Sequence, residues 1–220
     1  MNNKMFFIES GETVNEHKKK LLLEDTTEAS KTIITSYLGF SVDEILLNND
    51  ALIFGGCLRD IIAGDSNKIN DIDILVCPGA NRKIGLMLIE KGYVCLENMM
   101  KIDFFELYAK VSVHFPATFF KDGHKVQLIR PRFESTELDE ITHHPVASTY
   151  SLNSLQDFAK EVDLSCCGLI YHPTLGLREV IENAITHCQS KTLKILEDNK
   201  FYYKKRTEIR TSKLMEKGWK

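Results

Sequence analysis

Long apolar runs are missing from this sequence. Its most apolar stretch, residues 43–54, is interrupted by Asn48, Asn49 and Asp50, whereas a helix that crosses a bilayer needs about 20 mainly apolar residues. The first ten residues contain one Lys and a short apolar patch, which fits neither a secretory signal nor a transit peptide. The sequence therefore favours a cytoplasmic protein with no membrane partner.

Closely spaced cysteine pairs are missing too. The sequence has no Cys-x-x-Cys pair among its six cysteines, which are Cys57, Cys77, Cys95, Cys166, Cys167 and Cys188. The adjacent Cys166 and Cys167 make a poor element of a disulfide framework, and the other spacings do not match a zinc site. We expect reduced thiols that act mostly as small buried hydrophobic residues.

Two common phosphate-binding motifs are absent as well. No Gly-x-Gly-x-x-Gly follows a strand-like segment, and no Gly-x-x-x-x-Gly-Lys-Ser/Thr occurs anywhere in the chain. Neither a dinucleotide-binding fold nor a P-loop enzyme is therefore indicated.

What is present is an ordinary globular composition with an uneven charge distribution. The 220 residues are 43% hydrophobic and 27% charged, which suits one domain or one domain plus a short appendage. Residues 191–220 carry ten Lys and Arg against four Asp and Glu, although the whole chain has a net charge of −3. We predict a main domain over residues 1–190 and a basic helical extension over 191–220. The extension indicates either contact with a polyanion or a solvated Lys-rich helix.

The hydrophobic pattern predicts a mixture of strands and helices. Strands are expected over residues 51–54, 70–76, 93–96, part of 104–113, and 125–129. Helices are expected over residues 26–38, 57–63, 80–91, 154–162, 175–194 and 201–217, with a further short helix that begins with a capping box of Ser41 and Glu44. This order predicts an α/β (α+β) domain, with a mixed sheet flanked by helices and a short helical C-terminal extension.

The first segment with chemical content joins a strand to a helix. Gly55 and Gly56 follow the expected strand 51–54, so the backbone can turn tightly there and a ligand can approach it closely. The N–H groups at the start of the next helix favour an anion such as phosphate. Arg59 adds a planar set of hydrogen-bond donors nearby.

The second segment holds two aspartates. Asp71 and Asp73 alternate with Ile72 and Ile74 along an expected strand, so both carboxylates lie on one face, roughly 7 Å apart. Such a pair can be merely solvated, or it can hold Mg²⁺ or Mn²⁺. A phosphate cradle that faces a two-carboxylate metal site is what nucleotidyl transfer requires.

Together these segments resemble a known family. The pattern Gly55-Gly56-x-Leu58-Arg59-Asp60, then Gly64, then Asp71-x-Asp73 resembles the head domain of the DNA polymerase β-like nucleotidyltransferase superfamily. Within it, the class II CCA-adding enzymes and bacterial poly(A) polymerases are the most similar. The resemblance implies a polymerase β-like palm in which Asp71 and Asp73 are catalytic and hold Mg²⁺ or Mn²⁺, while Gly55, Gly56 and Arg59 bind the triphosphate of an NTP.

Two later segments extend the resemblance. Residues 125–134 resemble the strand that follows in this family, which implies a nucleotide-binding role for Arg132. Residues 157–171 resemble the segment that meets the nucleotide sugar, which implies such a role for Asp163. This chain departs from the family at Gln127, where an acidic residue is common, and it has no good match to the motif that reads base edges.

The resemblance implies an enzyme that moves an NMP from an NTP to an acceptor hydroxyl and releases pyrophosphate. The basic C-terminus makes an RNA 3′ end the preferred acceptor, with four candidate nucleic-acid-binding residues, Lys204, Lys205, Arg206 and Arg210. Two alternatives stay open. The chain could be a non-catalytic module that binds nucleotide or RNA, which the amide at Gln127 favours, or a nucleotidyltransferase of a toxin–antitoxin or host-interaction system that modifies a protein.

Overall fold

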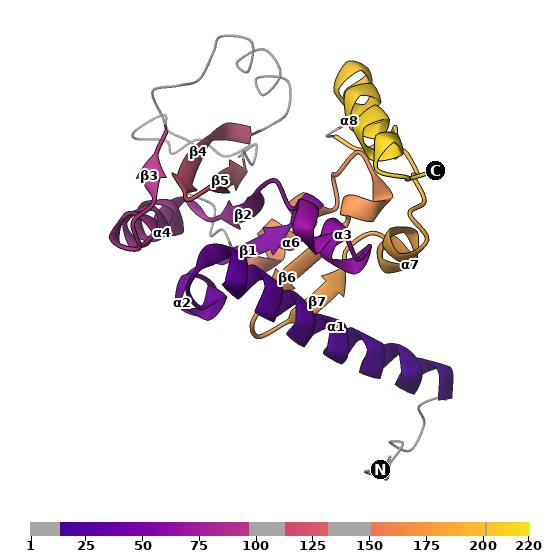
Figure 1. Ribbon diagram of the computed structural model, residues 1–220, viewed down its shortest axis with the longest axis horizontal. Helices are drawn as coiled ribbons and strands as arrows, with labels where there is room; N and C mark the ends of the chain where they lie inside the picture. Colours follow the sequence, from indigo (N-terminus) through magenta and orange to yellow (C-terminus); the bar gives the residue numbers. More distant parts are fainter. Residues whose placement is uncertain (1–13, 97–112, 132–150, 201) are drawn as a thin grey trace, which may run out of the picture.

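A computed structural model describes residues 14–96, 113–131, 151–200 and 202–220 (Figure 1). Within these residues, seven strands form one sheet in the order β3-β4-β5-β2-β1-β6-β7. Their bounds are β1 Ala51–Phe54, β2 Ile72–Val76, β3 Val94–Cys95, β4 Val113–Lys121, β5 His124–Pro131, β6 Leu169–His172 and β7 Gly176–Glu179. Only β2 and β5 are parallel neighbours; the other pairs are antiparallel. The sheet is therefore mixed, as the sequence predicts.

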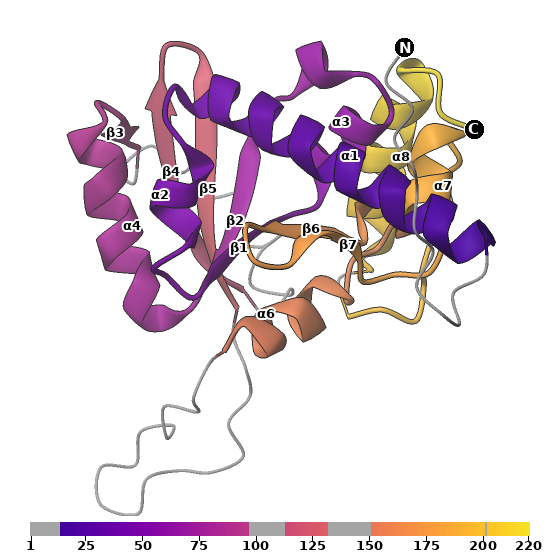
Figure 2. The ribbon, with the colours of Figure 1, turned by 90° about the horizontal axis from the view of Figure 1, so that it is seen from below.

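Helices flank this sheet and cover its ends. The described helices are α1 Val14–Leu38, α2 Val42–Leu46, α3 Gly56–Ile62, α4 Pro78–Glu90, α6 Leu152–Ala159, α7 Ala184–Gln189 and α8 Lys204–Glu216, with short 3-10 turns η1 Ser66–Lys68 and η3 Ser165–Cys167. Helix α1 contacts β7, and α6 contacts β1 and β6. Helices α4 and α8 lie at opposite ends of the molecule (Figures 1 and 2). None of the described helices is long and apolar enough to span a membrane.

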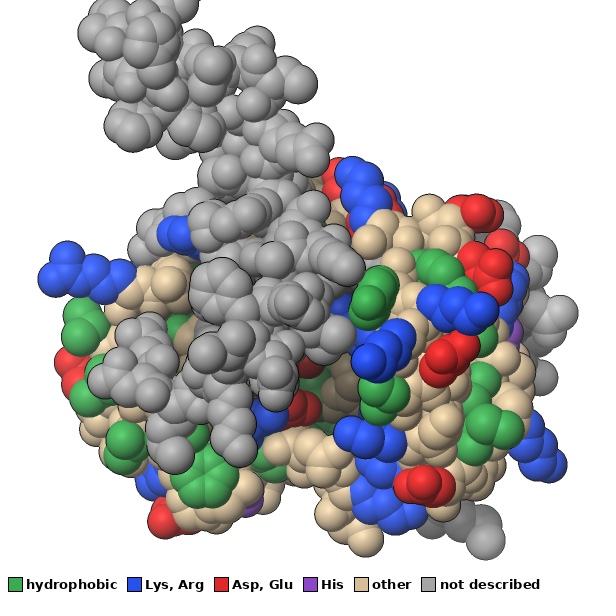
Figure 3. All heavy atoms as spheres, turned by 90° about the horizontal axis from the view of Figure 1, so that it is seen from above, with side chains coloured by type: hydrophobic (Ala, Val, Ile, Leu, Met, Phe, Trp, Pro, Cys, Tyr) green, Lys and Arg blue, Asp and Glu red, His purple; other side chains and the backbone are tan. Residues whose placement is uncertain are grey.

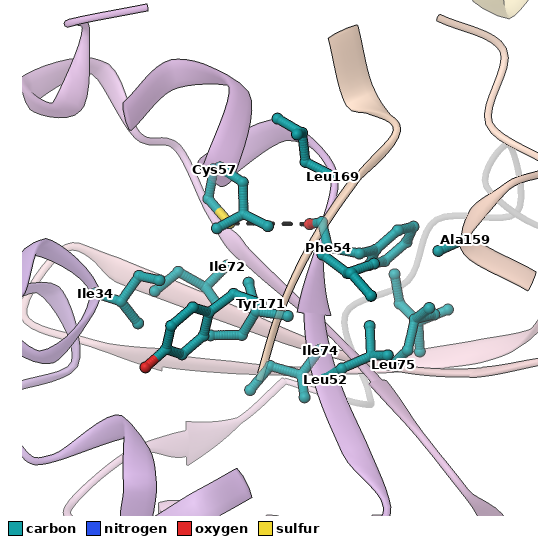
Figure 4. Close-up of a cluster of buried hydrophobic side chains, with 14 of the residues drawn as sticks. Ile34, Leu52, Phe54, Cys57, Ile72, Ile74, Leu75, Ala159, Leu169 and Tyr171 are labelled. Carbon is teal, nitrogen blue, oxygen red and sulfur yellow. Dashed lines mark hydrogen bonds between the residues drawn. The ribbon is translucent and has the colours of Figure 1, made fainter. Parts of the chain in front are cut away.

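The core is centred on the middle strands of the sheet. All four residues of β1 are buried, and Ile72, Ile74 and Tyr171 are almost completely so. Figure 4 shows side chains from α1, β1, β2, α6 and β6 gathering around this point. Each fully buried aliphatic side chain contributes about 1.5–3 kcal/mol. Asp73 on β2, and Asp71 just before it, therefore adjoin the most deeply buried part of the sheet.

Several sequence expectations are confirmed by these elements. The strand over residues 51–54 has the predicted bounds, and the strand expected from residue 70 begins at Ile72. The two strands are antiparallel neighbours, with Phe54 opposite Asp73. All six cysteines are free thiols. The strand expected within residues 104–113 falls almost wholly outside the described residues.

Two local predictions are wrong. Residues 175–194 form β7 and the short helix α7 instead of one helix. Gly176, with φ of 68°, makes the turn that pairs β7 with β6, and this pairing buries Leu177. Ser41 begins α2 without a side-chain cap; the capping box lies at Ser151 and Ser154 and begins α6.

The C-terminal segment packs closely against the rest of the chain. Thr207, Leu214 and Trp219 are buried, and backbone hydrogen bonds join Ser165 to Lys194 and Leu196 to Asp163. The division at residue 190 into a main domain and an extension stays a prediction.

Candidate active site

The turn between β1 and α3 depends on a glycine. Gly55 has φ of 78° and precedes the first residue of α3, and residues with a Cβ rarely adopt this left-handed conformation. Its N–H donates to the carbonyl oxygen of Leu169 on β6. Gly56 follows and lines an open cleft. Because β1 and β2 are antiparallel, with Phe54 opposite Asp73, the turn places the start of α3 beside the start of β2.

Asp71 and Asp73 lie at the start of β2, where the cleft opens. Asp73 pairs in register with Phe54 on β1 and with Gln127 on β5. The Nζ of Lys125 lies 2.8 Å from Oδ2 of Asp71. Strand β5 therefore presents an ammonium group and an amide to the two carboxylates.

Asp73 holds its proton more strongly than an exposed aspartate does. Burial, followed by the negative charge of Asp71, raises the pKa of Asp73 to about 7, and the nearby charges of Arg210 and Lys125 offset only part of this effect. A divalent cation between two such carboxylates relieves the repulsion between their charges.

This raised pKa predicts how stability depends on pH without metal. The native state retains the Asp73 proton up to about pH 7, whereas an unfolded Asp loses it near pH 4. The stabilisation is therefore complete below pH 4 and is lost as the pH rises through 7. We expect Asp73→Asn, which mimics the protonated acid, to raise the melting temperature at pH 8. Thermal unfolding in EDTA at pH 4.5 and 8 measures this; an equal effect at both pH values would contradict it.

The cleft has two walls of opposite charge and a volume of about 740 Å³. One wall comes from β2 and β5, and the other comes from α8. The lining residues are Gly56, Arg59, Asn70, Asp71, Asp73, Gln127, Arg206, Arg210, Lys213, Leu214, Glu216 and Lys217. Figure 3 looks onto a face of the molecule where Lys and Arg side chains gather beside a hollow. The arrangement suits a ligand with a cation at one end and several anionic groups at the other.

The basic wall follows from one face of α8. Arg206, Arg210, Lys213 and Lys217 are spaced by four, three and four residues, so they lie on the same side of a helix. Leu214 and Thr207 are buried on the neighbouring face and hold the helix against the domain. Of the four candidate nucleic-acid-binding residues, Arg206 and Arg210 line the cleft, whereas Lys204 and Lys205 are exposed and do not.

Asp163 lies behind this wall and is completely buried. Its carboxylate forms an ion pair with Arg210 and accepts a 2.8 Å hydrogen bond from Thr207. Asp163 is not among the residues that line the cleft, so it meets α8 instead of the open space where the resemblance placed a nucleotide sugar. Its evident role is to fix Arg210.

Arg59 is also engaged inside the protein. Its guanidinium donates to Asp60 at 2.7 Å, lies 3.5 Å from the sulfur of Cys167, and faces the ring of Trp219 at 5.7 Å. It still contributes to the cleft wall. A hydrogen bond from Cys166 and the charges of Arg210 and Arg59 lower the pKa of Cys167 to about 6, so this sulfur links the two arginines.

The sequence-predicted site residues are therefore partly brought together. Gly55 lies at the turn beside one cleft. The predicted residues that line this cleft are Gly56, Arg59, Asp71, Asp73, Arg206 and Arg210. Arg132 lies outside the described residues. The lining residues that the sequence did not indicate are Asn70, Leu214, Glu216 and Lys217. The helical spacing of the basic residues in α8 was the signal that could have identified Lys217.

No set of three His, Cys, Asp or Glu side chains could hold a metal within the described part of the chain. The donors present are two carboxylates and one amide. Mg²⁺ in phosphoryl-transfer sites is commonly held by one or two carboxylates together with substrate phosphates and water. The residues therefore fit a divalent cation that arrives with a nucleotide, and they do not fit a closed structural metal site.

Comparisons with known proteins concern the fold. No protein-family model and no curated protein matches the sequence. Solved structures that are similar include a CCA-adding enzyme in complex with CTP, with 17% identity and a TM-score of 0.46 over 79% of this chain and 36% of the other. A tRNA nucleotidyltransferase complexed with a primer tRNA and an ATP analog is similar as well. Its identity is 17% and its TM-score 0.41, over 68% of this chain and 36% of the other.

The Thermotoga maritima CCA-adding enzyme complexed with tRNA is similar at 17% identity, with a TM-score of 0.39, over 80% of this chain and 33% of that one. This chain thus spans about a third of the length of these enzymes. At such low identities and TM-scores the likeness assigns no activity, and the function proposed below depends on the side chains of the cleft.

Proposed function

We propose that this protein is a metal-dependent nucleotidyltransferase that moves an NMP from an NTP to an acceptor hydroxyl. The observation that carries the proposal is that Asp71 and Asp73 face the basic side of α8 across one cleft. A metal–triphosphate complex has the matching charge pattern, because its cation needs oxygen ligands and its phosphates need cationic partners.

Each wall has a distinct role in this proposal. Asp71 and Asp73 would hold Mg²⁺ or Mn²⁺, which would neutralise triphosphate charge and lower the pKa of the attacking hydroxyl. Arg210, Lys213 and Lys217 bind phosphate oxygens, and Arg59 supports the same wall. The absence of a side chain at Gly56 lets a phosphate approach the backbone closely.

The transfer itself is an in-line displacement. The acceptor oxygen forms a bond to the α-phosphorus, the bond from that phosphorus to the α–β bridging oxygen breaks, and pyrophosphate leaves while the hydroxyl proton passes to solvent. The protein contributes position and charge: it holds the reacting groups together and neutralises the leaving group with the α8 cations.

The acceptor we propose is an RNA 3′ end. Lys204 and Lys205 are exposed at the first turn of α8, next to the cleft-lining Arg206, and they extend the positive surface beyond the space that a triphosphate fills. A polyanionic acceptor gains from such an extension, and its binding weakens as salt concentration rises.

A second candidate function is nucleotide binding without chemistry. It is favoured by the contacts of the carboxylates themselves, since Lys125 already pairs with Asp71 at 2.8 Å. If Lys125 replaces the metal permanently, the basic wall still binds a nucleotide and no transfer occurs.

A label-transfer assay distinguishes these functions. The purified protein is incubated with Mg²⁺, each α-labelled NTP in turn, total RNA and cell lysate, beside an Asp71→Ala/Asp73→Ala variant. We expect label in RNA with the unmodified protein and none with the double variant. Label in a protein band would redirect the proposal to protein nucleotidylation. Nucleotide binding without transfer from any of the four NTPs would support the non-catalytic module.

A further inference from the structure

The amide of Gln127 faces both aspartates at the same distance. Its inner terminal atom lies 3.2 Å from Oδ1 of Asp73 and 3.2 Å from Oδ2 of Asp71. Gln127 is held there by its register, opposite Asp73 on β2 and opposite Thr118 on β4. The three groups therefore converge on one point at the edge of the cleft.

The meaning of this contact depends on which amide atom points inward. With the nitrogen inward, the amide donates a hydrogen bond to each carboxylate. With the oxygen inward, three oxygen atoms converge beside the ammonium group of Lys125, which lies 2.8 Å from Oδ2 of Asp71. A divalent cation between the three oxygens would relieve the repulsion that remains. Neighbouring ligand oxygens around Mg²⁺, with metal–oxygen distances of about 2.1 Å, are separated by about 3 Å. The observed spacing suits both orientations.

The outer end of the amide is satisfied in both orientations as well. It lies 3.4 Å from the hydroxyl oxygen of Thr118. A hydroxyl donates to an amide oxygen or accepts from an amide nitrogen equally well. A half-turn of the amide therefore exchanges the inner atom without leaving the outer atom unpaired.

We propose that Gln127 is a neutral third ligand of the divalent cation that Asp71 and Asp73 bind, through its Oε1, and that the amide turns over when the cation enters. The proposal rests on the metal-dependent function proposed above. In the absence of metal the amide nitrogen holds the two carboxylates together. With metal bound, the ligands carry two negative charges, whereas a third carboxylate at position 127 would make three. Part of the cation's charge therefore remains available to phosphate.

Metal binding alone tests this role, without turnover. Mn²⁺ affinity is measured by electron paramagnetic resonance at pH 8 for the unmodified protein and for Gln127→Leu, which removes both amide atoms at similar volume. We expect the Mn²⁺ affinity of Gln127→Leu to fall about tenfold. Gln127→Glu, which keeps an inward oxygen and adds a charge, is expected to bind Mn²⁺ more tightly than the unmodified protein.

The controls separate the ligand role from a structural one. Gln189→Leu makes the same change at an exposed position of α7 and should leave Mn²⁺ affinity unchanged. If Gln127→Leu binds Mn²⁺ as tightly as the unmodified protein, or more tightly, Gln127 only donates hydrogen bonds to the carboxylates and the proposal is wrong. If Gln127→Leu does not fold, the test uses Gln127→Glu, and an unchanged Mn²⁺ affinity in that variant would also contradict the proposal. If the unmodified protein binds no Mn²⁺, the metal-dependent function fails as well.

Discussion

Replacing Asp73 by Asn is expected to lower the rate of nucleotidyl transfer by about 10³-fold or more, equivalent to about 4 kcal/mol of transition-state stabilisation. Asp73 lies on β2, opposite Phe54 of β1 and Gln127 of β5. The substitution removes the charge of its carboxylate and keeps the shape of the side chain. The amide side chain then repels no neighbour and still fills the same space. Single-turnover transfer at saturating NTP and Mg²⁺ measures the loss.

The same variant should be folded and at least as stable as the unmodified protein at pH 8, because Asp73 is held in a site that raises its pKa to about 7. Loss of transfer therefore cannot be assigned to unfolding. Asp157→Asn makes the same change at an exposed position of α6 and should retain full transfer. Full transfer by Asp73→Asn would contradict the proposed metal role and favour the non-catalytic module.

Replacing Arg210 by Met is expected to destabilise the protein by about 3–5 kcal/mol. Asp163 is completely buried, and without Arg210 its remaining side-chain partner is the hydroxyl of Thr207. A buried carboxylate that loses its cation retains the whole cost of its dehydration. For a domain of this size we expect the melting temperature to fall by about 10 °C.

A double-mutant cycle identifies the cause of this loss. In Asp163→Asn/Arg210→Met the buried charge is gone, so much of the lost stability should return. Lys205→Met removes an exposed charge from the same helix and should change the melting temperature by less than about 2 °C. If Arg210→Met resembles Lys205→Met, the buried ion pair does not hold α8 in place.

Local sequence signals were sufficient for the acidic wall of the site. The two glycines, the short helix and the alternating aspartates lie within about 20 residues of one another, and each obeys a rule of local geometry. The buried strand over residues 51–54 and the face of Asp71 and Asp73 follow from the same rules. These relations could be predicted because they join residues that are close in the sequence, whereas the pairing of β1 with β6 and of β2 with β5 could not.

The basic wall depends on contacts that no local pattern specifies. The helical spacing of basic residues in α8 is visible in the sequence, but the partner of that face is not. Asp163 and Arg210 are 47 positions apart, and the resemblance assigned Asp163 to a nucleotide sugar because nothing in the sequence indicated that Arg210 would reach it. The strand β7 was missed for a similar reason, since its pairing with β6 overrides the local helical pattern.

The contacts of Arg59 could not be predicted from the sequence either. Its position after the two glycines favours phosphate binding, yet its guanidinium is shared among Asp60, Cys167 and Trp219. The sequence specifies that a cation stands beside the turn. The number of its donors that remain available depends on residues more than 100 positions away in the chain.

The attachment of α8 also has a consequence for how the site forms and dissolves. Asp71 and Asp73 lie more than 130 positions before Arg206 in the chain, so the cleft exists only while α8 is docked on the sheet domain. Local opening of this one helix, with the core around β1 intact, would disassemble the site without unfolding the protein. A nucleotide that spans both walls would bind only the docked form and would therefore slow amide hydrogen exchange along α8.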